Sequence, residues 1–471
     1  MKRDRSGDLA QLVADFVCSD IRSTGNTLDR VKLVFADTVS ATVAGATSDV
    51  VGPLRSYVLA QPSALPDKLV LGTSIQASAE HAALINGTMA AALEFDDVLS
   101  LMPAHPSAVV LAALMATDAA LDAPGERVLD AYAVGVEAGA RMAQAMTLDH
   151  YKRGFHATGT IALFSAVAAL ARIHHLDPDI FKRSLGLAAS MSSGVQGNFG
   201  TMTKPLHSGW AARNAVAAVA LAQAGLTACE SIFEAEGGYF SAYGSPASNV
   251  DNMPTPFGKP WVFDEPGVTL KLFPCCYANH RGMDALIHLM KALEVDASEI
   301  QKIRCRVPPG GLIPLKFSRP KTHFESLFSM PYALAVTALD QMPGLPSFHQ
   351  TRVVASDVQT MLERIDVVES SECVAAYPDF NSKSYGSRGE VHVEVDTTDG
   401  RTLEKRVRYA PGHPDRPMTW DQAESKFIGC LQSAGFSTQH ASGLFPQLRD
   451  LEQLPLFRGL VQQLVLNKET T

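Results

Sequence analysis

Histidine and lysine side chains stand at four places where a loop is expected to lead into a helix. These residues are His105, His156, Lys204 with His207, and Lys271 with His280. A helix N-terminus presents unpaired N–H groups and the positive end of the helix dipole, so it attracts carboxylates. Lysines in such places could bind and neutralise acid groups, and a histidine could transfer a proton near neutral pH. The pattern predicts a receptor for a small polycarboxylate.

An acidic cluster precedes the first of these histidines in "LEFDDVLSLMPAHPSA". We expect substrate binding by Glu94, Asp96, Asp97, His207 and His280, and catalysis by His105, His156, Lys204 and Lys271. His105 is favoured over His156 as the base because only His105 shares its loop with carboxylates that could orient it. Taken singly, each residue has a simpler interpretation as a helix cap, a packing residue or a solvated charge.

Metal and cofactor motifs are absent from the sequence. Asp96, Asp97 and His105 could coordinate a divalent ion, but there is no H-E-x-x-H and no second cluster to support one. Neither a G-x-x-x-x-G-K-[ST] phosphate loop nor a strand followed by G-x-G-x-x-G occurs. We therefore expect no metal and no cofactor. The 7 cysteines include no C-x-x-C pair, which fits reduced thiols in a cytosolic protein.

Composition narrows the class of protein. The 471 residues are 46% hydrophobic and 19% charged, which is enough for a large core and two or more domains. A net charge of -9 argues against a general binder of nucleic acid or of membrane surfaces. The amino terminus lacks the apolar run of a secretory signal, and no uncharged apolar stretch is long enough to span a membrane. We expect a cytoplasmic protein with no nucleic-acid or membrane partner.

The elements that must position these residues change in type along the chain. Residues 9–226 have helical periodicity, with faces rich in alanine and glycine that allow close packing. After about residue 250 proline becomes frequent, "IQKIRCRV" alternates like a strand, and "EVHVEVDTTDGRTLEKRVRY" indicates two strands around a turn. The fold class is therefore mainly α. A large all-helical bundle domain (1–268 plus 409–471) is expected with a smaller α+β lid domain (269–408) inserted late in the chain.

Several segments together resemble one known family. The segments are "NGTMAAALEFDD", "HPSAVVLAALMA", "GFHATGTIALFSA", "TKPLHSGWAARNAV", "FPCCYANHRGMDA", "SMPYALAVTALD" and "PGHPDRPMTWD". In this order they resemble the MmgE/PrpD family, which includes 2-methylcitrate dehydratase, cis-aconitate decarboxylase and iminodisuccinate epimerase. The resemblance implies a helical domain with an α+β lid, a homodimer, and chemistry without a metal or organic cofactor. It places His105, His156, Lys204 and Lys271 in the cleft between domains, with His207, His280 and the Asp96-Asp97 pair nearby.

The chain departs from the family pattern beside the acidic cluster. Many dehydratase-like members read "AHALDFDDTH" where this chain reads "AAALEFDDVL". The differing positions are Ala91, Glu94, Val98 and Leu99. We expect these positions to lie in the wall of the site. The loss of a hydroxyl and a histidine there argues against 2-methylcitrate or aconitate as the exact substrate.

Three functions remain open from the sequence. The first is a lyase that removes water or carbon dioxide from a small di- or tricarboxylate after abstraction of an α-proton. The second is an epimerase of an iminodisuccinate-like amino or imino dicarboxylate, which returns the proton to the opposite face. The third is a non-catalytic carboxylate-binding dimer. It is the least favoured, because a scaffold need not keep converging ionisable groups.

Overall fold

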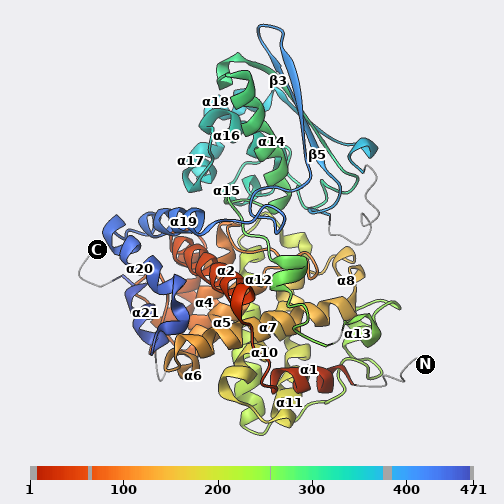
Figure 1. Cartoon of the computed structure of the whole chain (residues 1–471), viewed down its shortest axis with the longest axis vertical. Coiled ribbons are helices and arrows are strands. Elements are labelled where there is room, and N and C mark those ends of the chain that lie inside the picture. The colour runs from red at the N-terminus through yellow and green to blue at the C-terminus, as the bar shows by residue number, and fades with distance from the viewer. Residues whose placement is uncertain (1–7, 62–65, 255, 375–384, 467–471) are drawn as a thin grey trace.

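The computed structural model describes residues 8–61, 66–254, 256–374 and 385–466. A large helical part carries a smaller part in which helices pack on a β-sheet (Figure 1). The predicted fold class, mainly α with a smaller α+β lid, is confirmed.

Segments from both halves of the chain form the helical part. Its helices are α1 (Leu9–Val17), α2 (Gly25–Ala44), α3 (Val51–Leu59), α4 (Ala79–Ala92), α5 (Pro106–Met115), α6 (Asp118–Leu121), α7 (Gly125–Met146), α8 (Asp149–Lys152), α9 (Ala157–Thr160), α10 (Ala162–His174), α11 (Pro178–Met191), α12 (Thr203–Gln223), α13 (Tyr239–Tyr243), α19 (Trp420–Ser433), α20 (Thr438–Arg449) and α21 (Phe457–Gln463). A two-stranded hairpin joins β1 (Lys68–Leu69) to β2 (Gln76–Ala77).

The carboxyl-terminal helices pack against the amino-terminal ones. The rings of Phe35 in α2 and Phe457 in α21 lie 5.9 Å apart, and both side chains are buried. Helix α19 lies along α2, on the side of the helical part that faces the lid (Figure 1). The exact domain boundaries, 268 and 409, stay a prediction.

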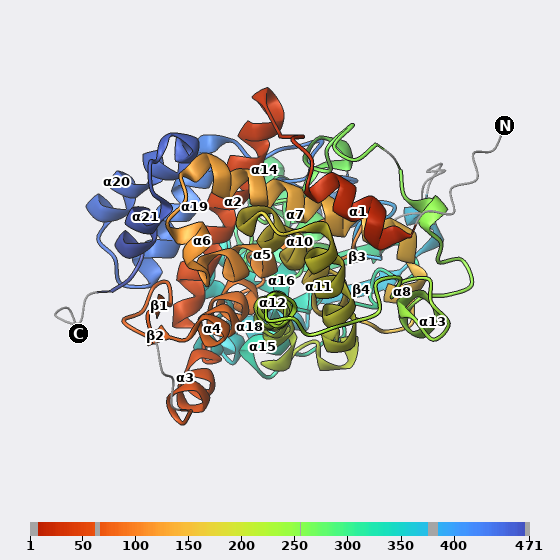
Figure 2. The same cartoon turned by 90° about the horizontal axis from the view of Figure 1, so that it is seen from below.

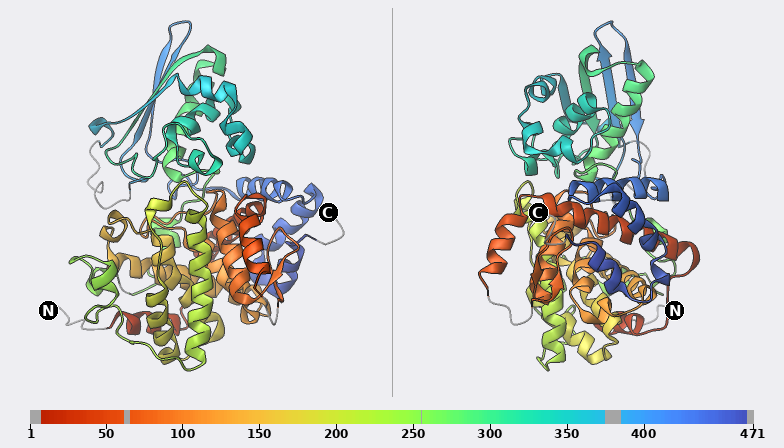
Figure 3. Two further views of the ribbon diagram at one scale, coloured as in Figure 1. Left: turned by 180° about the vertical axis from the view of Figure 1, so that it is seen from behind. Right: turned by 90° about the vertical axis from the view of Figure 1, so that its left-hand side faces the viewer.

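The lid is a four-stranded sheet with helices on one face (Figure 3). Its elements are α14 (Tyr277–Leu293), β3 (Ile300–Val307), α15 (His323–Ser326), α16 (Met330–Asp340), α17 (Gln350–Val353), α18 (Ser356–Leu362), β4 (Ile365–Glu369), β5 (Val391–Thr397) and β6 (Thr402–Val407). The strand order is β4-β3-β5-β6, parallel between β3 and β4 and antiparallel elsewhere. The three alternating strands predicted from the sequence are β3, β5 and β6, whereas β4 was not recognised.

Close packing of α4 on α12 sets the position of two site residues (Figure 2). Gly87 and Gly209 lie at the contact, and a Cβ at Gly209 would come within 2.1 Å of the Leu84 carbonyl oxygen. The two backbones therefore approach more closely than any larger residue would allow. This contact brings the end of α4, followed by Glu94, to the start of α12, which carries Lys204.

One segment is long and apolar enough to cross a membrane by composition alone. It is Ala157–His174, which covers α9 and α10, and 89% of it is buried within the fold. Among the residues that the structure describes, this is the single such segment, and its burial is that of a core helix.

Candidate active site

A cavity of about 580 Å³, mouth included, lies where the helical part meets the lid. Its walls are Glu94, Val98, Pro103, Ala104, His105, Tyr151, His156, Phe199, Lys204, Cys276, Tyr277, Pro314, Phe328, Gly386 and Ser387. Four of the nine predicted site residues thus line one pocket, namely Glu94, His105, His156 and Lys204. They come from the loop after α4 and from the starts of α5, α9 and α12.

The backbone of the loop after α4 directs the Glu94 and Asp96 carboxylates into the interior. Glu94 follows the last turn of α4 in the left-handed region, with φ at 50°. That backbone costs a non-glycine residue about 1–2 kcal/mol. Val98 then pairs with Thr269 through two backbone hydrogen bonds of 2.8 and 2.9 Å. Because Lys271 follows Thr269 closely, this bridge places the Lys271 ammonium beside the acidic loop.

Two lysines and two carboxylates form a buried cluster. Lys204 donates to one oxygen of Glu94, and Lys271 lies 3.2 Å from the other. Lys271 also lies 3.1 Å from Asp96, and all four side chains are at most 3% exposed. These four charges, two positive and two negative, offset each other in the closed interior, as buried ion pairs require.

The charges in this cluster support one another. Burial alone would raise the pKa of Glu94, but the Lys204 and Lys271 charges outweigh it and hold that pKa below its ordinary value. Burial is likewise outweighed at Asp96, where the neighbouring His105, Lys271 and Lys204 side chains lower the pKa. Burial works against the charged form of Lys271, yet Asp96 and Glu94 raise its pKa. All three side chains are therefore ionised at neutral pH.

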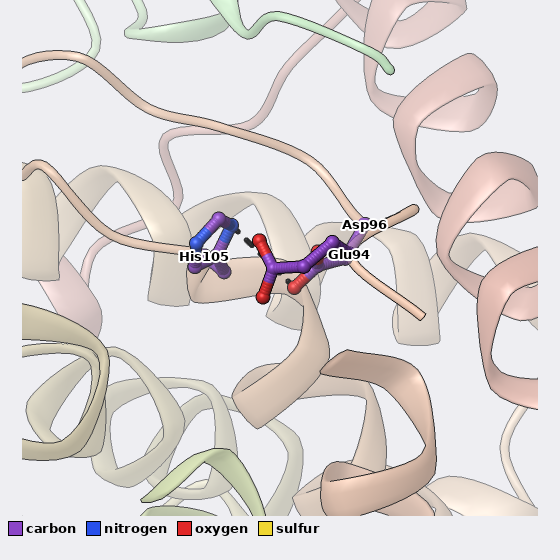
Figure 4. A group of neighbouring side chains, drawn as sticks. All are labelled: Glu94, Asp96 and His105. Carbon is purple, nitrogen blue, oxygen red and sulfur yellow. Dashed lines mark ion pairs between the residues drawn. The ribbon is translucent and has the colours of Figure 1, made fainter. Parts of the chain in front are cut away.

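His105 is held in one orientation by its own loop. Its Nδ1 lies 2.6 Å from the Asp97 carbonyl oxygen and 3.4 Å from the Asp96 carboxylate. A carbonyl oxygen can only accept a hydrogen bond, so Nδ1 carries the proton and Nε2 keeps its lone pair. Figure 4 shows one ring nitrogen facing the carboxylates and the other turned away from them. Burial lowers the pKa of His105 to about 4, although Asp96 acts in the opposite direction, so the ring is neutral at pH 7.

Glu94, Asp96 and His105 could also hold a metal ion, because one donor atom from each lies within 4.8 Å of the others. Lys271, however, already contacts both carboxylates, at 3.2 and 3.1 Å. A cation in the same space would meet the positive charge of this ammonium. The donor set therefore fits an ammonium better than a metal ion.

His156 and His207 form a second pair beside the pocket. Their Nδ1 atoms lie 2.9 Å apart, and His156 is the one that lines the cavity. One Nδ1 must donate and the other accept, so the accepting ring carries its proton on Nε2. Burial, assisted by the charge of Lys204, holds the pKa of His156 well below its ordinary value and lowers that of His207 to about 4. His207 therefore contacts His156 from behind and is not part of the pocket wall.

Asp97 also lies behind the wall. Its carboxylate accepts a 2.7 Å hydrogen bond from Ser107, which accepts one of 2.6 Å from Tyr132. Burial raises the pKa of Asp97 to about 8, against the lowering effect of the Ser107 hydrogen bond. Asp97 is thus largely protonated at neutral pH, and only its backbone carbonyl contacts His105.

His280, which was predicted to bind substrate, does not line the pocket. It is fully buried in the first turns of α14, between the rings of Phe273 and Tyr277 at 5.2 and 5.3 Å. Burial, together with the Lys271 charge, lowers its pKa to about 3. Since Tyr277 lines the pocket and His280 does not, contact of His280 with a substrate stays a prediction without geometric support.

The four departures from the family pattern do not all lie in the pocket wall. Glu94 and Val98 line the cavity, as expected. Leu99 and Ala91 are 0% and 1% exposed and lie outside the lining, Leu99 within the apolar core of the helical part. The expectation that a histidine is lost from the site wall is therefore wrong for these two positions. A side chain there would point into packed interior.

Sequence reasoning missed several residues around the cluster. Tyr151, Phe199 and Phe328 contribute wall surface, and Tyr132 supports Asp97 from behind. Tyr132 and Tyr151 lie in helices, where periodicity predicts burial but not what lies beside them, whereas Phe199 and Phe328 lie outside helices and strands and have no periodic signal.

Comparison with known proteins identifies the family of this chain. The MmgE/PrpD N-terminal domain matches residues 7–250 and the MmgE/PrpD C-terminal domain matches residues 273–443. The chain belongs to the MmgE/PrpD family. It is 26% identical over 417 residues to the cis-aconitate decarboxylase of Homo sapiens, covering 86% of this chain and 83% of the relative. It is 27% identical over 361 residues to the cis-aconitate decarboxylase of Mus musculus, and this match covers 74% of this chain and 70% of the relative. It is 26% identical over 430 residues to the cis-aconitate decarboxylase of Aspergillus terreus, and this match covers 84% of this chain and 82% of the relative.

Proposed function

We propose that this protein is a lyase that removes water or carbon dioxide from a small di- or tricarboxylate after α-proton abstraction, without a metal or organic cofactor. Membership of the MmgE/PrpD family and the decarboxylase names of the relatives support a lyase. The observation that carries the proposal is the 2.6 Å contact between His105 Nδ1 and the Asp97 carbonyl. It leaves Nε2 as an unprotonated base at the pocket.

His105 would accept the α-proton at Nε2. Burial keeps the ring neutral before reaction, so the lone pair is available at pH 7. Once the proton arrives, the Asp96 carboxylate at 3.4 Å offsets the new positive charge on the ring. A base held by a fixed partner and a counter-charge contributes about 10²–10⁴-fold to a rate.

Lys204 would bind a substrate carboxylate. Among the described residues, it is the only lysine or arginine in the pocket wall, and its ammonium is already paired with Glu94. A bound carboxylate would share this ammonium with Glu94. As the α-proton leaves, negative charge moves onto that carboxylate, so the same ammonium stabilises the transition state.

The wall also bears on the choice of substrate. Val98 places a methyl-bearing side chain beside Glu94 and His105, where many family members have a hydroxyl. A substrate hydroxyl would find no hydrogen-bond partner at Val98, which costs affinity. This argues against a hydroxy acid such as 2-methylcitrate as the exact substrate, and it does not bear on an acid without a hydroxyl.

The alternatives have less support. The relatives reported above are all named decarboxylases, and none of these names supports an epimerase. A non-catalytic carboxylate-binding dimer would not require a histidine with its tautomer fixed at the pocket. Assembly as a homodimer and a cytoplasmic location stay predictions.

Proton NMR of reactions in D₂O tests the proposal. Purified protein is incubated with cis-aconitate and with a panel of other small di- and tricarboxylates, and both product and deuterium incorporation are followed. We expect a product that has lost water or carbon dioxide, formed about 10²–10⁴-fold more slowly by His105→Gln. Deuterium entering recovered substrate without product formation would instead identify an epimerase. Wild-type turnover by a folded His105→Gln variant would exclude His105 as the base.

A further inference from the structure

Lys426 lies beneath the pocket rather than in its wall. It stands in the middle of α19, and its side chain is 6% exposed. Its ammonium donates to the carbonyl oxygens of Phe95 at 2.8 Å and Lys271 at 2.9 Å. It also forms an ion pair of 2.7 Å with Asp37 of α2. One side chain from the carboxyl-terminal segment thus joins three distant parts of the chain.

Two of these parts carry the buried cluster. Phe95 lies between Glu94 and Asp96, and Lys271 bridges those two carboxylates. The Phe95 and Lys271 carbonyls belong to irregular segments, so they need partners outside helices and strands. The Lys426 ammonium supplies a hydrogen-bond donor to each of these two carbonyls. The ammonium also lies 3.8 Å from the centre of the Phe95 ring, which adds a cation–π contact.

We propose that Lys426 is a positioning residue that fixes the acidic loop and Lys271 relative to each other, and thereby holds Asp96 against His105. Only the Val98–Thr269 bridge otherwise joins the loop and the Lys271 segment through backbone hydrogen bonds. Lys426 closes the other end of this junction, on the side of Glu94 and Asp96. The kinetic part of the test rests on the proposed function, whereas the structural part does not.

Lys426 could also serve only to neutralise the buried Asp37 carboxylate, without any effect on the site. The Asp37 side chain is fully buried, so loss of Lys426 alone leaves an unpaired acidic group in the interior. Breaking such a pair destabilises a protein whatever its function. The test must therefore remove the charge problem separately from the two carbonyl contacts.

Three variants make that separation. The single variant Lys426→Met removes the two carbonyl contacts and leaves the Asp37 carboxylate without its ion-pair partner. The double variant Asp37→Asn with Lys426→Met also removes the carbonyl contacts, but it leaves no unpaired charge. Lys32→Met is the matched control, because Lys32 is also a buried lysine, 8% exposed, whose ion pair with Glu452 of 2.9 Å joins α2 to the carboxyl-terminal segment. Lys32 does not line the pocket or contact the acidic loop.

Hydrogen–deuterium exchange of residues 94–99 and 268–272, and steady-state kinetics on whichever acid the wild type turns over, are measured for all three. In both Lys426 variants we expect exchange at least about 10-fold faster in these segments and kcat about 10–100-fold lower, with KM changed less, because small misplacements of catalytic groups are costly. The Lys32→Met variant should keep wild-type kcat and wild-type exchange in these segments.

Each outcome of the double variant decides the proposal. Wild-type exchange in 94–99 and 268–272 would show that Lys426 only neutralises Asp37, and would overturn the proposal even if no lyase activity exists. Faster exchange with unchanged kcat would also overturn it. If the wild type turns over no acid, the proposed function fails, and the exchange data alone then decide whether Lys426 fixes the loop.

Discussion

The ion pairs beneath the pocket and those on the open face of the lid sheet use the same side-chain chemistry in different surroundings. Lys271, Glu94 and Asp96 are at most 3% exposed. On the sheet, Arg304 pairs with Glu394 and Asp396 at 2.5 Å, and its side chain is 39% exposed. Solvent screens the second group and not the first. The sheet pairs can therefore form and break at little cost, whereas the buried cluster must stay intact.

The difference shows which charges indicate function. In the sequence, charged side chains of the sheet group follow strand periodicity, whereas the buried group combines an acidic run at residues 94–97 with lysines more than 100 positions away. Of the two groups, only the buried one lies at a pocket, with one of its carboxylates 3.4 Å from the Nδ1 atom of a histidine. Burying such a cluster brings no clear gain in stability over an apolar core, so its presence at the pocket argues for a catalytic purpose.

The largest effect is expected where the buried cluster loses its central cation. Lys271→Met leaves Glu94 and Asp96 with less compensation in a closed interior. We expect the free energy of unfolding to fall by about 3–5 kcal/mol, as for other broken buried pairs. Urea unfolding of the variant and the wild type measures this. A fall below about 1 kcal/mol would mean that the cluster behaves like the sheet pairs.

The next effect depends on pH and is expected from Asp97, whose pKa burial raises to about 8. At pH values between the ordinary aspartate pKa and 8, the Asp97 side chain is protonated in the folded protein and ionised in the unfolded chain. This contribution to stability is complete at low pH and is lost as pH rises through 8, by about 1 kcal/mol per pH unit. Asp97→Asn keeps the neutral form at every pH.

The measurement for Asp97 compares the unfolding free energies of Asp97→Asn and the wild type at pH 5 and pH 8. The variant should gain stability relative to the wild type as pH rises. A difference that stays constant between the two pH values would contradict the raised pKa. Ser107 can still donate to the asparagine oxygen, so the local hydrogen bond is kept.

The smallest effect is expected on the sheet. Arg304→Gln removes two exposed ion pairs and should change the unfolding free energy by less than about 1 kcal/mol. Its effect should also shrink in high salt, because exposed pairs are screened. Any acid turned over by the wild type should be turned over at the same rate. A loss comparable to that of Lys271→Met would remove the distinction between the two groups.

The sequence predicted those site residues that stand next to a recognisable helix start. His105, His156 and Lys204 each stand near a predicted helix start, and these starts do converge on one pocket. The strands at 300–307 and around the T-T-D-G turn alternate clearly, so they were predicted. By contrast, β4 has only 5 residues with a single buried one, which leaves little pattern to recognise.

What the sequence could not predict depends on contacts between distant segments. Nothing local distinguishes His207, which supports His156, from a residue that contacts substrate. Ala91 is buried by the packing of α4, and Leu99 is packed into the interior, away from the pocket, where the loop after α4 folds back. Lys426 has the periodicity of an ordinary helix residue, and its three partners lie at least 155 positions away.

The central claim is that burial and the Asp97 carbonyl hold His105 as a neutral base with its lone pair at Nε2. Nitrogen-15 NMR of the histidine rings, with the His105 signals assigned from their loss in His105→Gln, tests it most directly. At pH 7 we expect a neutral His105 ring with its proton on Nδ1, and protonation only near pH 4. An imidazolium at pH 7, or a neutral ring with its proton on Nε2, would contradict the account.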